Sequence, residues 1–160
     1  MTSFNFSSFI KLIISITIPL TLGFVAGMFT AQAVPDWFAG INKPIFSPPN
    51  WIFGPVWTAL YLIMGISFYI IWQQESTKRK KYAIVFYAIQ LSLNFAWSFL
   101  FFYFHLIGFA LFDIVLMWFT ILLMIINFYP LSKKAAIINI PYLLWVSFAT
   151  ILNAAYFILN

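Results

Sequence analysis

The stretch that decides the fold runs from Trp37 to Gly65 and reads WFAGINKPIFSPPNWIFGPVWTALYLIMG. It holds the one long connection rich in proline, tryptophan and glycine in an otherwise strongly apolar chain. Pro44, Pro48 and Pro49 exclude a regular helix around them, because proline fixes φ and lacks a backbone donor. An ordered aromatic loop of this kind suits a lid over a pocket between membrane helices. A stiff interfacial linker is the alternative.

The composition is that of a membrane protein. Of the 160 residues, 64% are hydrophobic and 7% are charged, whereas soluble domains carry about 25% charged residues. So few charges cannot cover the surface of a soluble domain, and we therefore predict an all-α integral membrane protein with one domain. The chain has no cysteine, which excludes disulfides and thiolate metal sites. The net charge of +5 is interpreted as an orientation signal and not as a nucleic-acid-binding one.

Five apolar segments are long enough to cross a bilayer core of about 30 Å, which takes roughly 20 helical residues. The predicted spans are Phe9–Ala31, Ile52–Gln73, Tyr82–Phe104, Phe109–Tyr129 and Ala135–Leu159, and together they form one five-helix domain over residues 1–160. Ala31-Gln32-Ala33 resembles a signal-peptide cleavage site. The apolar run before it has about 20 residues, longer than a signal h-region, so we interpret it as a real span. Pro19 is expected to bend this span.

The basic residues predict the orientation. The chain has eight Lys and Arg, and seven of them share the side of the N-terminus: Lys11, Lys78, Arg79, Lys80, Lys81, Lys133 and Lys134. The opposite side holds only Lys43. The positive-inside rule then places the N-terminus in the cytoplasm and the Gln32–Trp51 connection outside. The run Lys78–Lys81 anchors this topology or contacts anionic lipid headgroups. The abundance of Phe, Ile, Lys and Asn hints at an AT-rich bacterial genome, and so at a bacterial inner membrane.

Polar side chains inside the spans are candidates for either packing or function. Asp113 is the one acidic residue at membrane depth, where a charge costs at least about 2.5–3.5 kcal/mol. It must point into the bundle, pair or be protonated, and Lys43 is its nearest candidate partner by topology. Polar stripes on the last three spans are expected to form hydrogen bonds across helices. Asn94, Asp113 and Trp145 are also candidates to line a shared cavity.

Conventional catalytic patterns are absent from the sequence, and aromatic residues take their place. The spans contain no pair of carboxylates for acid–base catalysis, and no phosphate loop or nucleophile elbow is present. The single histidine, His105, is either an interfacial residue or a haem ligand. Seven Trp, eight Tyr and 21 Phe are present. A pocket lined by the indoles of Trp51, Trp97 and Trp145 would suit a large flat hydrophobic ligand, such as a sterol or a tetrapyrrole.

Several motifs in order carry a resemblance to a known family. They are KP (43–44), PP (48–49), FGPVW (53–57), LYLIMG (60–65), QLSLNFAWS (90–98), FF (101–102), PYLLW (141–145), FA (148–149) and LN (152–153). The chain thereby resembles the translocator proteins, or tryptophan-rich sensory proteins, also called peripheral benzodiazepine receptors. The resemblance covers nearly the whole chain.

The resemblance implies a five-helix bundle, often a homodimer, in which the first loop covers a ligand pocket. It implies binding of protoporphyrin IX, haem, cholesterol in some members, and synthetic isoquinoline carboxamide or benzodiazepine ligands, with no cofactor required. The positions that match the family's pocket are Asn94, Trp97, Phe109, Asp113, Leu116, Ala149 and Leu152. Trp51 and Trp145 match two tryptophans implicated in light-dependent protoporphyrin degradation in some bacterial members.

Two features depart from the family pattern. The residues after Tyr156 contain no basic side chain, so the C-terminal sterol-recognition pattern is broken, although Leu123, Tyr129 and Lys133 match it formally. Val85 and Ile89 occupy the positions of a glycine pair that some members use for dimer contact. These departures put sterol transport and that dimer face in doubt.

Three functions follow as hypotheses. The leading one is a porphyrin-binding membrane receptor in which any turnover is light-driven: an excited porphyrin with oxygen oxidises an indole, which then attacks the macrocycle. The second is a transporter of porphyrin, lipid or sterol. The third is a sensory protein in which ligand occupancy alters a partner contact through the Lys78–Lys81 loop.

Overall fold

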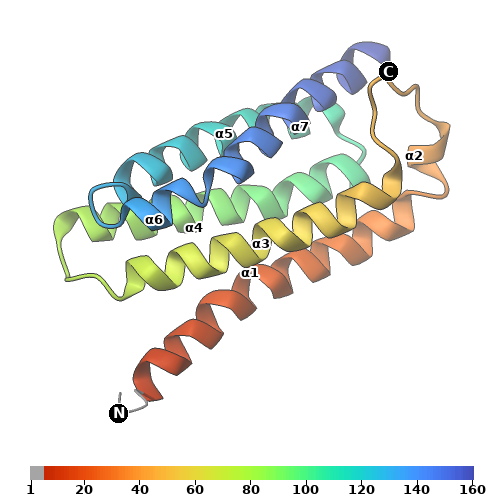
Figure 1. The fold of residues 1–160 in the computed structure, drawn as a ribbon. Coiled ribbons are helices and arrows are strands. Elements are labelled where there is room, and N and C mark those ends of the chain that lie inside the picture. The colour runs from red at the N-terminus through yellow and green to blue at the C-terminus, as the bar shows by residue number, and fades with distance from the viewer. Residues whose placement is uncertain (1–5) are drawn as a thin grey trace.

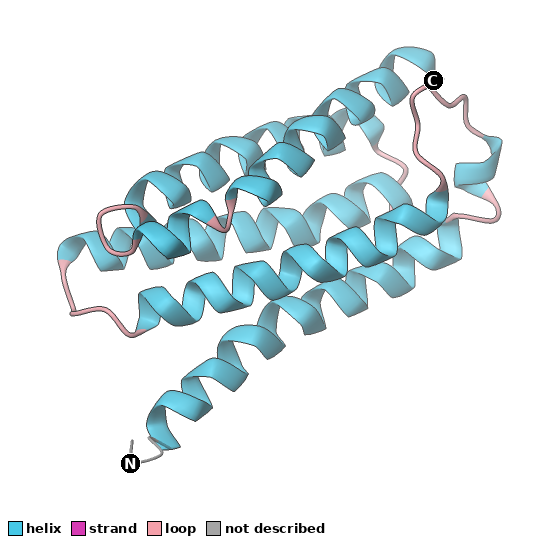
Figure 2. Ribbon diagram, in the orientation of Figure 1, coloured by secondary structure: helices cyan, strands magenta, loops and turns pink. Residues whose placement is uncertain are grey.

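The structure is a computed structural model that describes residues 6–160, and its regular structure there is helical throughout (Figure 2). The helices are α1 (Phe6–Ala33), α2 (Trp37–Gly40), α3 (Asn50–Trp72), α4 (Lys78–Ser98), α5 (Ile107–Phe128), α6 (Lys133–Ile137) and α7 (Ile140–Leu159). A π-helical segment, Phe99–Tyr103, continues α4. Five segments in the described part of the chain are long and apolar enough to span a membrane. The predicted all-α, five-span membrane protein is confirmed.

The ends of the helices follow from local chemistry. The Thr77 hydroxyl accepts a hydrogen bond from the Lys80 backbone N–H at 3.1 Å and caps α4, as polar side chains at N-caps do. The predicted span Ala135–Leu159 corresponds to one candidate membrane span, Lys133–Leu159, within which two helices, α6 and α7, meet around Asn139. Pro141 explains this break, because it has no N–H to donate and its ring excludes a helical carbonyl four residues earlier. Near the first turn of α7 the same proline is tolerated.

The first connection is non-helical around its prolines, as the sequence predicts, and is folded rather than extended throughout. The backbone N–H of Ser47 donates to the Pro44 carbonyl at 2.9 Å and closes a turn. The short helix α2, Trp37–Gly40, precedes the prolines and is not predicted from the sequence. A segment of four residues is too short to show a helical period.

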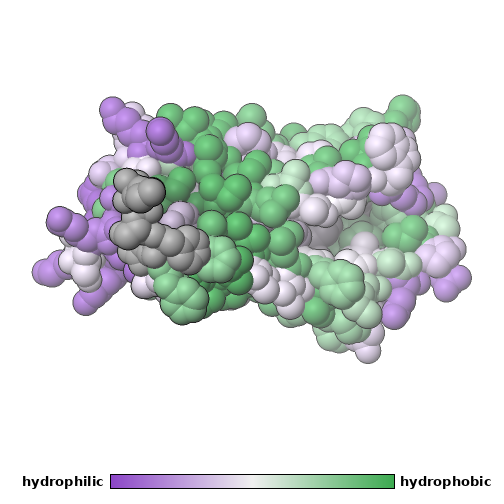
Figure 3. Space-filling view, turned by 60° about the horizontal axis from the view of Figure 1, so that its bottom comes forward, coloured by the Kyte–Doolittle hydropathy of each residue, from purple (hydrophilic) through white to green (hydrophobic). Residues whose placement is uncertain are grey.

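The spanning helices run side by side along the molecule (Figure 1). Helix α1 packs against α3 and α4, α5 packs against α4 and α7, and α6 lies against α3 and α5. The α3–α4 and α5–α6 connections share one end of the bundle, and the loop that contains α2 lies at the other end (Figure 1). A broad hydrophobic band separates two hydrophilic ends in the space-filling view (Figure 3). This is the surface expected of a protein embedded in lipid.

Helices α1 and α3 are in close contact from the middle of the bundle toward the α3–α4 connection. A Cβ added to Gly65 would lie 2.8 Å from the Ile16 Cα and from the Ser15 carbonyl oxygen. A Cβ added to Gly23 would overlap the ring of Tyr61. Helix α1 remains continuous through the buried Pro19, and Figure 1 shows it turning away from α3 toward its N-terminal end. Small residues therefore set the α1–α3 distance in this half.

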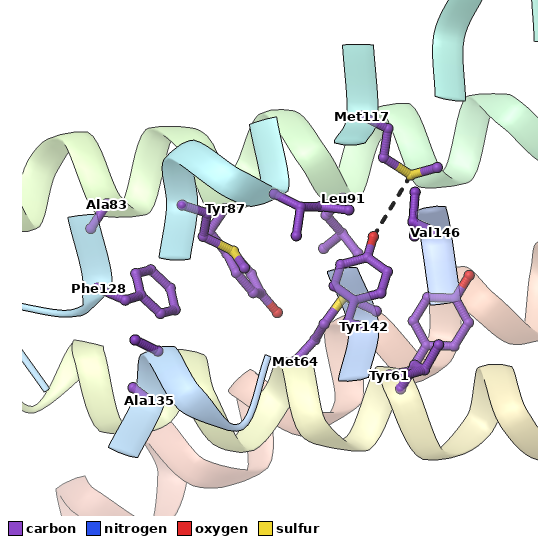
Figure 4. Close-up of a cluster of buried hydrophobic side chains, with 14 of the residues drawn as sticks. Tyr61, Met64, Ala83, Tyr87, Leu91, Met117, Phe128, Ala135, Tyr142 and Val146 are labelled. Atoms are coloured by element: carbon purple, nitrogen blue, oxygen red, sulfur yellow. Dashed lines mark hydrogen bonds between the residues drawn. The ribbon is translucent and has the colours of Figure 1, made fainter. Parts of the chain in front are cut away.

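The core fills the half of the bundle nearer the α3–α4 connection. Its fully buried side chains come from four spans, and Figure 4 shows many of them interdigitated. They include Met64, Ile71, Ala83, Ile114, Met117, Ile121, Met124, Phe128, Ala135, Tyr142 and Val146. Close packing on this scale leaves the other half of the molecule as the place for a site.

Candidate ligand-binding cavity

A cavity of about 940 Å³ occupies the half of the bundle beneath the first connection. Its walls come from the second half of α1, the first half of α3, the junction of α4 with the π-helical segment, and α7 between Trp145 and Tyr156; Phe38 of α2 also contributes. Space-filling atoms show a hollow in this half of the molecule (Figure 3). A π-helical turn at such a position is common at functional sites.

Aromatic side chains form much of the wall. The indoles of Trp51, Trp57, Trp97 and Trp145 all line the cavity. Trp97 stacks on Phe101 with ring centroids 5.3 Å apart, and the Phe53 and Trp145 rings meet edge to face at 6.0 Å. Such pairs add about 0.5–1.5 kcal/mol beyond the area they bury. The wall is therefore flat-faced, apolar and fixed in shape.

The cavity floor is a chain of hydrogen bonds that joins three helices. The Tyr61 hydroxyl donates to Asn94 Oδ1 at 2.5 Å, and Asn94 Nδ2 donates to the Tyr142 hydroxyl at 3.1 Å. The Tyr142 hydroxyl in turn donates to Gln90 Oε1 at 2.8 Å. Tyr61 and Asn94 face the cavity, whereas Tyr142 and Gln90 are fully buried behind them. The floor is polar yet internally satisfied, which makes it rigid.

A second polar contact fixes the wall higher up. Trp97 Nε1 donates to Asn153 Oδ1 at 2.9 Å, and Asn153 Nδ2 donates to the Ile107 carbonyl at 3.1 Å. This pair ties α4, α7 and the start of α5 together. The orientation of the Trp97 indole is therefore set before any ligand arrives.

The first connection is docked over the end of the cavity. The backbone N–H of Asn42 donates to Asn160 Oδ1 at 2.9 Å, and Asn160 Nδ2 donates to the Asn42 carbonyl at 3.1 Å. The hydroxyls of Ser47 and Tyr156 share a hydrogen bond of 2.7 Å. These contacts clasp residues 42–47 to the end of α7, and we call them the loop clasp. The predicted lid over a pocket is the arrangement observed.

His105 belongs to the same end of the molecule. Its ring stacks on the indole of Trp37 with centroids 4.3 Å apart and an interplanar angle of 13°. Its φ of 58° is left-handed, as the tight turn between the π-helical segment and α5 requires. Among residues 6–160, no group of three or more His, Cys, Asp or Glu side chains is placed to hold a metal ion.

Six of the nine positions predicted to bind ligand line the cavity. They are Trp51, Asn94, Trp97, Trp145, Ala149 and Leu152. Trp51 stands at the margin and is 73% exposed, whereas Ala149 and Leu152 are buried in the wall.

The other three positions, Phe109, Asp113 and Leu116, are not in the cavity wall. They lie on α5, which packs outside α4 and α7 and gives no residue to the wall. Phe109 and Leu116 face outward, with 66% and 41% of their surfaces exposed. The structure therefore does not place Asp113 in the wall of this cavity beside Asn94 and Trp145.

Asp113 is buried, and its Oδ2 has no hydrogen-bond partner in the structure. Its suggested partner Lys43 instead places Nζ over the Phe38 ring, 4.5 Å from the centroid. Lys43 therefore stands beside the cavity wall, at the end where the other seven basic residues are absent.

The sequence reasoning missed the contribution of α1. Leu20, Gly23, Gly27, Ala31 and Val34 all line the cavity. They recur at intervals of three or four residues, which is the period of one helix face. Small residues at this spacing were a signal available in the sequence, but glycine is frequent in membrane helices and does not by itself indicate a pocket.

Comparisons with known proteins agree with this architecture. A family model described as the TspO/MBR family matches residues 15–159. The chain is 43% identical over 151 residues to the tryptophan-rich protein TspO of Archaeoglobus fulgidus, covering 94% of this chain and 97% of that protein. It is 36% identical over 140 residues to the translocator protein of Homo sapiens, covering 86% and 83% of the two chains.

A third relative is the tryptophan-rich sensory protein of Cereibacter sphaeroides, which is 34% identical over 118 residues, covering 74% of this chain and 73% of that protein. The family model spans nearly the whole chain, and the alignment with the Archaeoglobus fulgidus protein covers most of both chains. This protein therefore belongs to the TspO/MBR family of integral, multi-pass membrane proteins.

Proposed function

We propose that this protein is a membrane receptor that binds flat apolar ligands of the porphyrin class, such as protoporphyrin IX or haem, in the cavity. The observation that carries the proposal is a cavity of about 940 Å³ walled by four indoles. This volume lies at the upper end of the roughly 300–1,000 Å³ usual for small-molecule pockets. Flat aromatic walls favour a flat aromatic guest, because offset stacking adds to burial of apolar surface.

Membership of the family supports a membrane receptor or sensory role. Binding is favoured over passage across the membrane because the cavity ends at a satisfied polar floor. Below that floor lies a core of side chains with no exposed surface, including Met64, Met117 and Ile121. A transport pathway would need this core to open, which costs packing energy.

Lys43 supports a ligand with carboxylates at one edge. Among the Lys and Arg side chains of residues 6–160 it is the one at the loop end of the bundle, and its Nζ lies over Phe38, which lines the cavity. A porphyrin seated with its apolar edge inward would present its propionates to this ammonium group. An exposed ion pair of this kind contributes about 0–1 kcal/mol, so it orients the ligand more than it holds it.

Light-dependent degradation of the bound porphyrin is the enzymatic part of the proposal. Trp51 and Trp145 both line the cavity, one at its exposed margin and one in the wall. An excited porphyrin together with oxygen would oxidise one of these indoles. Such chemistry needs no acid–base residue, which suits the apolar wall.

The test measures binding and bleaching separately. Protoporphyrin IX is titrated into wild type, Trp51→Phe, Trp145→Phe and the double variant, with tryptophan fluorescence quenching as the readout. Each complex is then illuminated and porphyrin absorbance is followed. We expect the double variant to bind and to lose bleaching. Unchanged bleaching in the double variant would contradict the catalytic role of Trp51 and Trp145. A failure of wild type to show saturable binding of protoporphyrin IX would contradict the receptor function.

A further inference from the structure

We propose that ligands enter and leave the cavity sideways, from the hydrocarbon region of the bilayer, through a gap between the outer halves of α1 and α3. We call this opening the lateral gap and define it by Phe24, Gly27 and Met28 of α1 and by Trp51 and Gly54 of α3. The inference rests on the proposed binding function and specifies its ligand class: molecules that are dissolved in the membrane.

The spacing of α1 and α3 changes along their length. At Gly65 an added Cβ would meet the backbone of α1 at 2.8 Å, and at Gly23 it would overlap the Tyr61 ring. At Gly27 and at Gly54 an added Cβ would meet no atom within 4 Å. Both of these glycines line the cavity. The helices are therefore in close contact at Gly65 and at Gly23, whereas Gly27 and Gly54 face open space at the cavity.

The side chains that flank this open space line the cavity and are also exposed on the surface of the protein. Phe24, Met28 and Trp51 all line the cavity, and their surfaces are 70%, 52% and 73% exposed. Phe24 and Met28 lie within the apolar span Phe6–Ala33. A residue that lines a cavity and remains exposed on a lipid-facing flank marks an opening toward lipid. Figure 3 shows the hollow on the flank of the molecule, in the half that carries the loop.

By contrast, the route from water into the cavity, past the first connection, is closed. The loop clasp joins Asn42 to Asn160 by two reciprocal hydrogen bonds and Ser47 to Tyr156 by a third. Trp37 adds a stacked contact with His105. A ligand arriving from water must break these contacts, whereas a ligand arriving from lipid meets an opening that already exists. The energy barrier to ligand entry is therefore lower through the lateral gap than past the loop clasp.

This route selects ligands by their partition into lipid. A flat molecule with an apolar body and charged groups at one edge can keep those groups at headgroup level while its body slides between α1 and α3. Lys43 lies beside Phe38, in the connection between the first two apolar spans. The lateral gap therefore admits the apolar body of the ligand, and the Lys43 ammonium group contacts its charged edge.

The experiment measures exchange rates in vesicles. The chain has no cysteine, so a double variant Asn42→Cys/Asn160→Cys can be joined by a short bismaleimide to hold the clasp shut. Gly27→Leu narrows the lateral gap, and leucine is better than glycine in a helix. Gly40→Leu is the matched control, because an added Cβ there also meets nothing within 4 Å and the residue is outside the cavity wall. Gly54→Leu is the second narrowing variant if Gly27→Leu does not fold.

Stopped-flow quenching with protoporphyrin IX already dissolved in phosphatidylcholine vesicles gives association and dissociation rates, and titration gives Kd. We expect Gly27→Leu to slow association by about tenfold; because Gly27 also lines the cavity, Kd is measured separately and the association rate is the readout. The cross-linked clasp and Gly40→Leu should exchange as wild type does. Loss of exchange in the cross-linked protein, or wild-type rates in Gly27→Leu, would overturn lateral entry and leave the proposed binding function standing. Absence of saturable binding to wild type would overturn both.

Discussion

Tyr142 shows how one buried hydroxyl holds the cavity floor. It accepts from Asn94 Nδ2 and donates to Gln90 Oε1, and its own side chain is fully buried. Tyr142→Phe leaves both amide groups short of a partner, and an unsatisfied buried polar group costs about 1–3 kcal/mol. We expect a loss of unfolding free energy in this range, measured by thermal unfolding in detergent. Tyr82→Phe is the control, since Tyr82 is 60% exposed; equal stability of the two variants would contradict the role of the floor.

Lys43 allows a test of ligand orientation at the same scale. We expect Lys43→Gln to weaken binding of protoporphyrin IX by about threefold, as an exposed ion pair would. The dimethyl ester, which has no carboxylates, should bind wild type and variant alike. Titration of both ligands by fluorescence quenching makes the comparison. An equal effect on acid and ester would show that Lys43 acts through packing on Phe38 and not through charge.

The placement of single residues was predictable from the sequence where their chemistry allows only one placement. Asn94 and Trp97 lie on one helix face, and a polar group and an indole on one face in lipid must turn inward. Asp113 obeys the same rule and is buried, but burial does not say against which neighbour. Its helix packs on the far side of α4 and α7 from the cavity. The order of the helices around the bundle decides which neighbour Asp113 packs against. The hydrophobic pattern of a single helix does not encode that order.

Helices α1 and α3 depend on glycine where they touch. We expect Gly65→Ala to destabilise the protein by about 1–3 kcal/mol, the usual cost of overpacking, because the new Cβ meets backbone atoms of α1 at 2.8 Å. Backbone cannot rotate away as a flexible side chain can. Thermal unfolding in detergent measures the change, with Gly40→Ala as the control whose Cβ meets nothing within 4 Å. A neutral Gly65→Ala would show that α1 shifts freely against α3.

The elements themselves were largely predictable, because spans of about 20 apolar residues leave few alternatives in lipid. The details that the sequence did not predict arise where local chemistry acts over a few residues. Pro141 divides the last span into α6 and α7, and α2 forms within the first connection. The π-helical segment Phe99–Tyr103 leaves no mark on the hydrophobic pattern, since its five residues are all apolar or aromatic.

The distribution of charge over the whole molecule gives its orientation. Seven Lys and Arg residues lie in the first half of α1, at the start of α4 or in α6, toward the end with the α3–α4 connection, and Lys43 lies in the loop at the other end. The positive-inside rule then predicts that the loop faces out of the cytoplasm. In the cysteine-free chain, we expect Ile45→Cys to react with an impermeant maleimide in intact cells. Ser76→Cys should react only once the membrane is opened. The reverse labelling pattern would contradict this orientation.

The central claim is that the cavity beneath the loop is where a flat apolar ligand binds. Ala149 is a small side chain in its wall, and Ala59 is an exposed alanine of α3 outside it. The most direct measurement is an equilibrium titration of protoporphyrin IX against Ala149→Leu and Ala59→Leu, both checked for wild-type unfolding. The account predicts that Ala149→Leu weakens binding by about tenfold while Ala59→Leu binds as wild type does. Equal, wild-type binding by both variants would place the ligand somewhere else.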